Sequence, residues 1–215
     1  MDEAEFRSLR FKGDLKRGAK LIGLNLTDNQ LNSFDLYRVE LQKWGDVYNL
    51  TSNLSDSSIL TRHFLDSILY LKGFPANKNL SVADIGTGAG FPGIPLAIVQ
   101  PDLKITLIEP TGKKVIFLNH IIRCLNLRNV IAIQTRVEDY QTENAYFDIV
   151  VSRALFNLNE LIKVTSLMIS PGGRLLVSKG RKYRQNLKKE LKNIEIKHLL
   201  IPIENVDRWL IILIT

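Results

Sequence analysis

A glycine-rich turn with an acidic residue on either side is the part of the sequence best suited to bind a small molecule. Asp84 is followed by Gly86–Gly93, which contains four glycines in eight residues, and Glu109 comes 23 residues after the first of them. A glycine turn between a strand and a helix lets a ligand approach the backbone, in the crevice where open α/β sheets bind nucleotides. A carboxylate about 20 residues further on commonly binds the ribose. These residues predict a nucleoside site.

The same glycines fit two kinds of nucleoside cofactor. Read from Gly88, they satisfy the G-x-G-x-x-G fingerprint of dinucleotide enzymes, which alone is a weak signal. Read from Gly86, they leave Asp84 two residues before the loop, where a carboxylate repels a pyrophosphate and favours a cation. S-adenosylmethionine carries such cations, a sulfonium and an ammonium, so we expect Asp84, Gly86, Gly88 and Glu109 to bind it. The alternative is that Asp84 caps the next helix and Glu109 is a surface acid.

Two later segments complete the expected pocket. Backbone N–H groups at Val137 or Glu138, with a carboxylate, match the hydrogen-bonding edge of adenine. Arg153 follows the next predicted strand, without the Asn/Asp-Pro-Pro-aromatic tetrad of amino-group methyltransferases or the nucleophilic cysteine of cytosine C5 enzymes. The one cysteine, Cys124, falls within a predicted helix and is expected to be buried. The pattern therefore favours a ring nitrogen as methyl acceptor, because its lone pair needs no covalent help.

The spacing of apolar residues predicts the elements that hold these side chains. Up to about residue 75 they recur at helical intervals, with helix starts at Thr27 and Ser55. Short β-branched runs and amphipathic stretches then alternate, which indicates βαβ units and a parallel sheet. The predicted strands are 80–85, 105–108, 130–133, 147–151 and 174–177, with helices at 92–99, 113–125, 159–168 and 181–192. Two final runs, 194–203 and 208–215, are too close for a helical crossover and are expected to pair antiparallel.

The expected fold is thus α/β, a mostly parallel, doubly wound, Rossmann-like sheet with an antiparallel C-terminal strand. Residues 1–75 are expected to form an N-terminal helical extension. Residues 76–215 are expected to form the S-adenosylmethionine-dependent domain, packed with the extension as one compact unit.

Composition narrows the range of partners. The 215 residues carry 29 Lys and Arg against 22 Asp and Glu, a net charge of +7, and residues 178–198 alone contribute +6. Such a charge predicts an anionic partner, nucleic acid before membrane. One cysteine and no apolar run long enough to cross a bilayer predict a cytoplasmic protein without membrane contact. Three histidines and one cysteine show no metal-site spacing, so we expect no metal, and we expect a monomer.

Seven segments give the chain a close resemblance to one family. They are 44–51, 62–67, 84–95, 113–118, 136–138, 147–154 and 171–180, of which Gly90–Pro95 and Ser152–Ala154 are the most specific. With these segments the sequence resembles the bacterial small-subunit ribosomal RNA (guanine-N7)-methyltransferase G family, also called glucose-inhibited division protein B. The resemblance implies a class I methyltransferase fold. It also implies methyl transfer from S-adenosylmethionine to guanine N7 in a 16S ribosomal RNA loop near the decoding region.

The resemblance also assigns site residues. Carried over position by position, it places cofactor contacts at Gly86, Phe91, Val137, Glu138 and Arg153. Pro110 stands where the family usually has serine, which puts a side-chain contact there in doubt but leaves the carboxylate of Glu109.

Because guanine N7 carries no proton, no general base is expected, and Arg153 is the candidate catalytic residue, orienting the guanine through O6. Its structural alternative is an ion pair with Asp84 or Asp148. His63 is expected to pack the helical extension on the sheet or to touch a phosphate, and His120 and His198 to lie on the surface. The candidate contacts to RNA phosphates are Lys179, Arg62, Lys113, Lys114, Arg181, Lys182 and Arg184.

Two functions of other classes remain open. One is a non-enzymatic ribosome-associated or RNA-binding protein. The other is an NAD-dependent oxidoreductase, against which the position of Asp84 counts.

Overall fold

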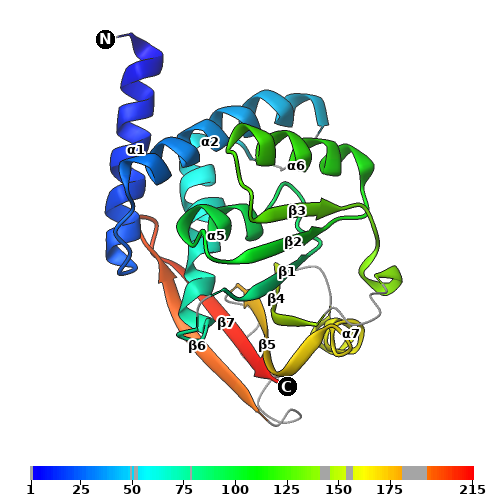
Figure 1. Cartoon of the computed structure of the whole chain (residues 1–215). Helices are drawn as coiled ribbons and strands as arrows, with labels where there is room; N and C mark the ends of the chain where they lie inside the picture. The colour runs from blue at the N-terminus through cyan, green and yellow to red at the C-terminus, as the bar shows by residue number, and fades with distance from the viewer. Residues whose placement is uncertain are drawn as a thin grey trace.

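The computed structural model describes residues 2–48, 50, 53–77, 79–140, 146–153, 157–180 and 193–215. Within them the strands form one seven-stranded sheet in the order β3-β2-β1-β4-β5-β7-β6 (Figure 1). The strands are β1 (Ser81–Ile85), β2 (Lys104–Ile108), β3 (Val130–Ile133), β4 (Phe147–Arg153), β5 (Ile169–Lys179), β6 (Ile194–Ile201) and β7 (Val206–Ile214).

Strand direction matches the expected fold class. β1 to β5 pair in parallel, and β7 is antiparallel to both of its neighbours, β5 and β6. Residues 202–205 are all that separate β6 from β7, which is too short for a crossover helix, so the predicted antiparallel end is confirmed. The strand order reverses at β1, which pairs with β2 on one side and β4 on the other. Open α/β sheets bind ligands at the carboxyl ends of the strands beside such a reversal.

Helices pack on both faces of the sheet, as a doubly wound fold requires (Figure 1). Helices α1, α2, α5 and α6 share one hydrophobic cluster with the sheet, and α7 contributes to a second on the other face. The predicted helix at 181–192 lies outside the described residues. The helices are α1 (Glu3–Leu21), α2 (Asp28–Tyr48), α3 (Asp56–Ser58), the π-helix η1 (Ile59–Leu65), α4 (Asp66–Ile68), the 3-10 helix η2 (Leu69–Gly73), α5 (Gly93–Val99), α6 (Gly112–Cys124), the 3-10 helix η3 (Val137–Asp139) and α7 (Leu158–Thr165).

Both predicted helix starts in the first part of the chain are confirmed. Thr27 Oγ1 accepts a hydrogen bond from the Gln30 N–H at 3.2 Å, and Gln30 Oε1 accepts from the Thr27 N–H at 2.9 Å. This reciprocal pair is a capping box, which satisfies two backbone donors at the start of α2. The Ser55 side chain accepts from the Ser58 N–H and is a simple N-cap of α3. Among the described residues, no helix has the length and apolar character needed to cross a membrane.

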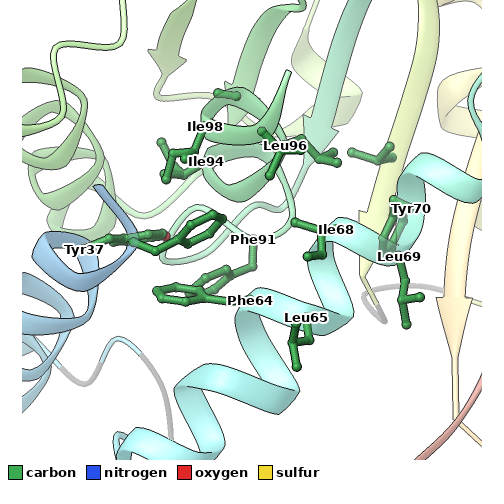
Figure 2. Packing of buried hydrophobic residues seen from close by; sticks show 14 of the residues in the cluster. Tyr37, Phe64, Leu65, Ile68, Leu69, Tyr70, Phe91, Ile94, Leu96 and Ile98 are labelled. Atoms are coloured by element: carbon green, nitrogen blue, oxygen red, sulfur yellow. The ribbon is translucent and has the colours of Figure 1, made fainter. Parts of the chain in front are cut away.

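Aromatic stacking joins the N-terminal helices to the sheet layer (Figure 2). The ring of Tyr37 on α2 stacks on Phe64 of η1 and on Phe91 in the glycine loop (residues 86–93), with centroid distances of 5.2 and 5.4 Å. All three side chains are buried. Burial of rings of this size is among the larger single contributions to a core, so these contacts fix the helices against the loop.

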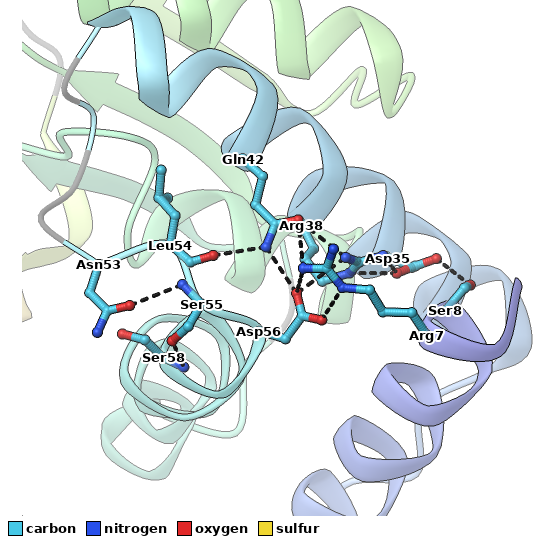
Figure 3. A network of polar contacts seen from close by, with 10 residues as sticks. All are labelled: Arg7, Ser8, Asp35, Arg38, Gln42, Asn53, Leu54, Ser55, Asp56 and Ser58. Atoms are coloured by element: carbon cyan, nitrogen blue, oxygen red, sulfur yellow. Dashed lines mark hydrogen bonds and ion pairs between the residues drawn. The ribbon is translucent and has the colours of Figure 1, made fainter. Parts of the chain in front are cut away.

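A charged network ties α1, α2 and α3 together (Figure 3). Arg7 donates from Nε and Nη2 to the two oxygens of Asp56, and Arg38, which is 3% exposed, pairs with Asp35 at 2.7 Å and with Asp56 at 3.2 Å. Burial alone raises the pKa of Asp56, but the hydrogen bond from Arg7 and the charge of Arg38 outweigh it and leave the pKa lowered. The pairing therefore stabilises the helical layer while Asp56 is ionised.

Candidate functional site

A cleft of about 810 Å³ opens at the carboxyl ends of β1, β2 and β3, which is a size typical of small-molecule sites. Four of the predicted cofactor-binding residues meet there: Gly86, Glu109, Val137 and Glu138. The remaining lining residues are Ile85, Ile108, Pro110, Thr111, Lys114, Gln134, Thr135, Arg136 and Asp139. Residues from three separate strand ends thus form one site, because parallel strands bring their carboxyl ends to one edge of the sheet.

Glu109 is a buried acid that holds the glycine loop. Its side chain accepts from the Gly88 N–H at 2.9 Å and from the Thr111 N–H at 3.0 Å, and Lys114 Nζ lies 3.8 Å away. The residue is 3% exposed, so the alternative of a surface acid was wrong. An ionised carboxylate offers about four lone-pair positions, which leaves two for ribose hydroxyls. The residue therefore fits the predicted contact while also bracing the loop.

Asp84 lies beneath the loop and does not line the cleft. Its Oδ2 accepts from the Thr87 hydroxyl at 2.5 Å and from the N–H of Gly93, the first residue of α5, at 2.7 Å. Burial raises its pKa to about 7, against lowering by those two hydrogen bonds and by the charge of Arg153. The structure therefore corrects the expectation of a direct ligand contact. Asp84 braces the loop and the start of the next helix, as its structural alternative required.

The glycine loop needs its glycines for different reasons. Gly86, Gly88 and Gly90 have φ values of 64°, 64° and 101°, a region that other residues rarely adopt. A Cβ at Gly90 would lie 2.8 Å from the Tyr37 hydroxyl, whereas a Cβ at Gly88 would meet nothing within 4 Å. The Tyr37 hydroxyl donates to the carbonyl of Ala89 at 2.5 Å. Helix α2 therefore supports the loop from behind, while the space around Gly88 stays open for a ligand.

Phe91 belongs to the core and not to the cleft. It is 1% exposed and lies against the ring of Tyr37 (Figure 2), and it also stacks on His63 with a centroid distance of 4.7 Å. The resemblance placed a cofactor contact here, and the structure limits that contact, because the ring is enclosed by aromatic neighbours. Its position between the loop and the π-helix makes it part of the packing that holds the loop.

Arg153, at the end of β4, is anchored to the π-helix η1. Its Nη1 donates to the carbonyl of Arg62 at 3.0 Å and to His63 Nδ1 at 3.2 Å, and its guanidinium carbon lies 5.1 Å from the centre of the Phe91 ring. In the described part of the chain it forms no ion pair with Asp84 or Asp148, so that structural alternative was wrong. The carboxylate of Asp148 instead accepts hydrogen bonds from Ser81.

His63 is held neutral at this junction. Burial and, to a lesser extent, the positive charge of Arg153 lower its pKa to about 3. A histidine that accepts at Nδ1 carries its proton on Nε2, which fixes the tautomer. The prediction that His63 packs the helical extension on the sheet is confirmed by its stack on Phe91. The hydrogen bond that His63 accepts from Arg153 was not predicted from the sequence.

The residues predicted to contact RNA phosphates differ in exposure and in their neighbours. Arg62 is exposed and lies 3.9 Å from Glu204, Lys113 is exposed on α6, and Lys179 is partly buried at the end of β5, where burial lowers its pKa. Lys114 lines the cofactor cleft beside Glu109, so it is not placed on an outer surface. The remaining three candidates, Arg181, Lys182 and Arg184, lie outside the described residues.

Two residues that support the site were not predicted from the sequence, and the burial of a third residue was predicted wrongly. Tyr37 falls at the helical spacing of Phe34 and Leu41, which marks it as a core residue but gives no sign that its hydroxyl holds the loop. Thr87 sits inside the glycine string, and its hydroxyl could have been proposed as a partner of Asp84. Cys124 is exposed, so the expectation that it is buried was wrong.

An open sheet with this strand order, a glycine loop after β1, an acid at the end of β2 and a nucleoside-sized cleft define a Rossmann-like S-adenosylmethionine-dependent methyltransferase. Solved structures share the fold. A SAM-dependent methyltransferase from Aquifex aeolicus superposes with a TM-score of 0.56 at 15% identity, over 80% of this chain and 97% of that one. The structure of M. jannaschii TYW2 in complex with AdoMet superposes with a TM-score of 0.50 at 20% identity, over 65% of this chain and 70% of that one.

Sequence relationships identify the family. Residues 30–204 match the GidB family, described as rRNA small subunit methyltransferase G, and the chain belongs to this family. A "Ribosomal RNA small subunit methyltransferase G" of Clostridium botulinum is 36% identical over 191 residues, which cover 87% of this chain and 80% of that protein. The protein of the same name from Acetivibrio thermocellus is 34% identical over an alignment of 223 residues, which covers 99% of this chain and 90% of that protein. The resemblance stated from the motifs is confirmed, and the chain is a methyltransferase that uses S-adenosylmethionine.

Proposed function

We propose that this enzyme transfers a methyl group from S-adenosylmethionine to N7 of a guanine in 16S ribosomal RNA. The observation that carries the proposal is the end of β4, where Arg153 is held by a carbonyl and by a neutral imidazole. The imidazole of His63, with a pKa of about 3 and Nδ1 occupied, is a poor general base at neutral pH. Guanine N7 has a free lone pair and needs none. The site therefore suits an acceptor that loses no proton.

The residues of the cleft fit the cofactor. We assign the ribose to the free lone pairs of Glu109 and the adenine edge to the backbone N–H groups of η3 at Val137 and Glu138. The bound cofactor supplies a methyl group activated by its sulfonium. The buried carboxylate of Asp84 lies close enough to the glycine loop to stabilise that positive charge through its field.

Arg153 is the candidate for orienting the guanine. A guanidinium has five N–H donors, and the two contacts described above use only Nη1. Among the described residues, Nε and Nη2 have no other acceptor and are left to donate to guanine O6, while N7 stays free to attack. Because the methyl group is already activated, the enzyme's main task is to hold donor and acceptor in line, which can be worth about 7–11 kcal/mol.

We propose that the RNA backbone lies across the carboxyl edge of the sheet. Lys179 ends β5 at that edge, and Arg62 belongs to the π-helix that holds Arg153. Cations placed around a pocket can bind phosphates without reading sequence, so shape must select the guanine. We further propose that the substrate is 16S ribosomal RNA or the small ribosomal subunit, and that the enzyme acts as a cytoplasmic monomer.

The decisive experiment is methylation of ribosomal RNA from a strain that lacks this activity. Purified protein and labelled S-adenosylmethionine should modify one guanine of 16S RNA, at N7, with Arg153→Ala as the matched inactive variant. RNA that stays unmodified, while a family member modifies the same sample, would overturn the proposal. Retained RNA binding without cofactor binding would point to a non-enzymatic protein, and nicotinamide cofactor binding by calorimetry to an oxidoreductase. Membership of the methyltransferase family favours neither.

A further inference from the structure

Three potential metal ligands of different chemistry meet on helices α2 and α6. They are Glu40 on α2 and, four residues apart on α6, His120 and Cys124. One ligand atom from each lies within 4.8 Å of the other two. Sequence spacing did not indicate a metal, because the third ligand comes from a helix 80 residues away in the chain. The packing of α2 on α6 creates the cluster.

The contacts converge on one nitrogen. Nε2 of His120 lies 2.5 Å from Glu40 Oε2 and 3.4 Å from Cys124 Sγ, while Nδ1 lies 3.9 Å from the sulfur. A Cys-His-Glu relay for nucleophilic catalysis would need the thiol and the carboxylate on opposite ring nitrogens. Here both face the same nitrogen, as ligands of a single ion do. Tetrahedral zinc bonds of about 2.0–2.3 Å place ligand atoms roughly 3.3–3.6 Å apart, which small side-chain rotations reach from these distances.

Neighbouring groups already orient two of the ligands. The ring of Trp44 lies over the imidazole of His120 with a centroid distance of 4.7 Å, and Lys43 Nζ lies 4.0 Å from the second oxygen of Glu40. The side chains of Glu40 and His120 are 12% and 25% exposed, and Cys124 is exposed. An ion can therefore enter from the side of the cysteine, and the fourth tetrahedral position faces solvent.

We propose that Glu40, His120 and Cys124 bind a zinc ion that clamps α2 to α6. Zinc accepts this combination of thiolate, imidazole and carboxylate. Its binding displaces the thiol proton into solvent, and His120 ligates through Nε2 as a neutral imidazole with its ring proton on Nδ1. The clamp would act on the layer behind the cofactor site, since Tyr37, one turn before Glu40, holds the glycine loop. This proposal is independent of the RNA substrate.

Cobalt is the probe that tests the site. Titration of the untagged, metal-free chain with Co²⁺ should give tetrahedral visible bands and a thiolate-to-cobalt charge-transfer band at one ion per chain, and Zn²⁺ should remove both. Cys124→Ser should abolish the charge-transfer band and weaken zinc binding by at least about 10-fold. Zinc should raise the thermal midpoint of the wild type and not that of Cys124→Ser.

The matched control is His198→Gln. His198 pairs with Asp207 at 2.7 Å on β6 and β7, and no thiol belongs to that pair in the described structure. This variant should bind cobalt as the wild type does. A wild type without the charge-transfer band, or a Cys124→Ser variant with unchanged zinc affinity, overturns the proposal. Because Cys124 is exposed, its replacement leaves the core intact, and circular dichroism checks this directly.

Discussion

The Nη1 group of Arg153 donates to Nδ1 of His63 at 3.2 Å, across 90 residues of sequence. This contact joins the end of β4, where the guanine is expected, to the π-helix of the N-terminal part. Runs of π-helix are rare and often mark functional sites, and this one also supplies the carbonyl of Arg62 to the same guanidinium. The helical segments therefore position the residue that we assign to the acceptor base.

Replacing His63 by phenylalanine tests this relationship. Phenylalanine keeps an aromatic ring to stack on Phe91 but removes the acceptor for Arg153. We expect kcat to fall roughly 10- to 100-fold, because a displacement near 1 Å can cost that much. Cofactor affinity, measured by calorimetry, should change little, since the adenosine cleft lies elsewhere. His63→Gln, which retains an acceptor, should recover part of the rate; equal loss in both variants would leave His63 a packing residue only.

The location of the site could be predicted from sequence because its signals are local. A glycine string after an apolar run, and acids at later strand ends, fall on one edge of any parallel sheet, so Gly86, Glu109 and Glu138 meet as expected. The orientation of Asp84 could not be predicted. A carboxylate two residues before the loop fits a ligand contact or a brace equally well. The choice depends on the close approach of Gly93, whose N–H reaches Asp84 at 2.7 Å.

Contacts between segments far apart in the sequence could not be predicted from local sequence patterns. The hydroxyl of Tyr37 and the ring of His63 reach the site only because α2 and η1 pack on the glycine loop. Periodicity marks the buried face of a helix, but it does not say which segment covers that face. For the same reason Cys124, which falls within a helix, was expected to be buried, whereas the packing of α6 leaves it exposed beside His120.

Asp84→Asn separates the charge of this residue from its bracing role. Asparagine keeps an oxygen to accept from Thr87 and Gly93 but carries no charge. S-adenosylmethionine affinity should fall at least about 10-fold if the field of the carboxylate stabilises the sulfonium, an effect of about 1.4 kcal/mol. Calorimetry at about pH 8, above the pKa of about 7 of Asp84, measures this directly, with Glu160→Gln on the exposed surface of α7 as the control. Unchanged affinity would restrict Asp84 to bracing the loop.

The raised pKa of Asp84 also predicts how stability depends on pH. Its folded-state pKa is about 7, above the ordinary 3.8, because burial disfavours the charge. Between these values the folded chain keeps a proton that the unfolded chain has released. The free energy of unfolding therefore falls as pH rises and levels off above about 7. From about pH 5 to pH 8 the wild type should lose roughly 2–3 kcal/mol relative to Asp84→Asn in urea denaturation; parallel pH profiles would contradict the raised pKa.

Glu109→Gln tests the link between the ribose acid and the loop. The amide nitrogen of glutamine cannot accept, so one of the N–H donors of Gly88 and Thr111 loses its partner. Hydrogen bonds to charged groups are worth about 1.5–3 kcal/mol, and we expect cofactor affinity to fall by about 10- to 100-fold. Glu160→Gln again serves as the control, and near-normal binding in Glu109→Gln would exclude the ribose contact.

Gly88→Ala and Gly90→Ala form a matched pair within the loop. Both residues have positive φ, which costs an alanine about 1–2 kcal/mol. At Gly90 the new Cβ would also lie 2.6 Å from Ile94 and 2.8 Å from the Tyr37 hydroxyl, so this variant should lose clearly more stability in urea denaturation. At Gly88 the methyl group enters open space and should mainly weaken cofactor binding. Equal stability losses would show that Tyr37 does not press on the loop.

Salt dependence tests which cations face the RNA. Lys179 and Arg62 lie near the carboxyl edge of the sheet, whereas Lys16 is exposed on α1 and serves as the control. A cation that contacts a single-stranded phosphate contributes about 0.7 to the slope of log K against log salt, and about 0.9 on a duplex. Lys179→Ala and Arg62→Ala should therefore each flatten the slope by about 0.7 and weaken binding to all RNA sequences alike. The Lys16→Ala slope should match the wild type. If the Lys179→Ala slope also matches the wild type, the RNA phosphates do not contact the end of β5. The basic residues of the segment 178–198 then have another role.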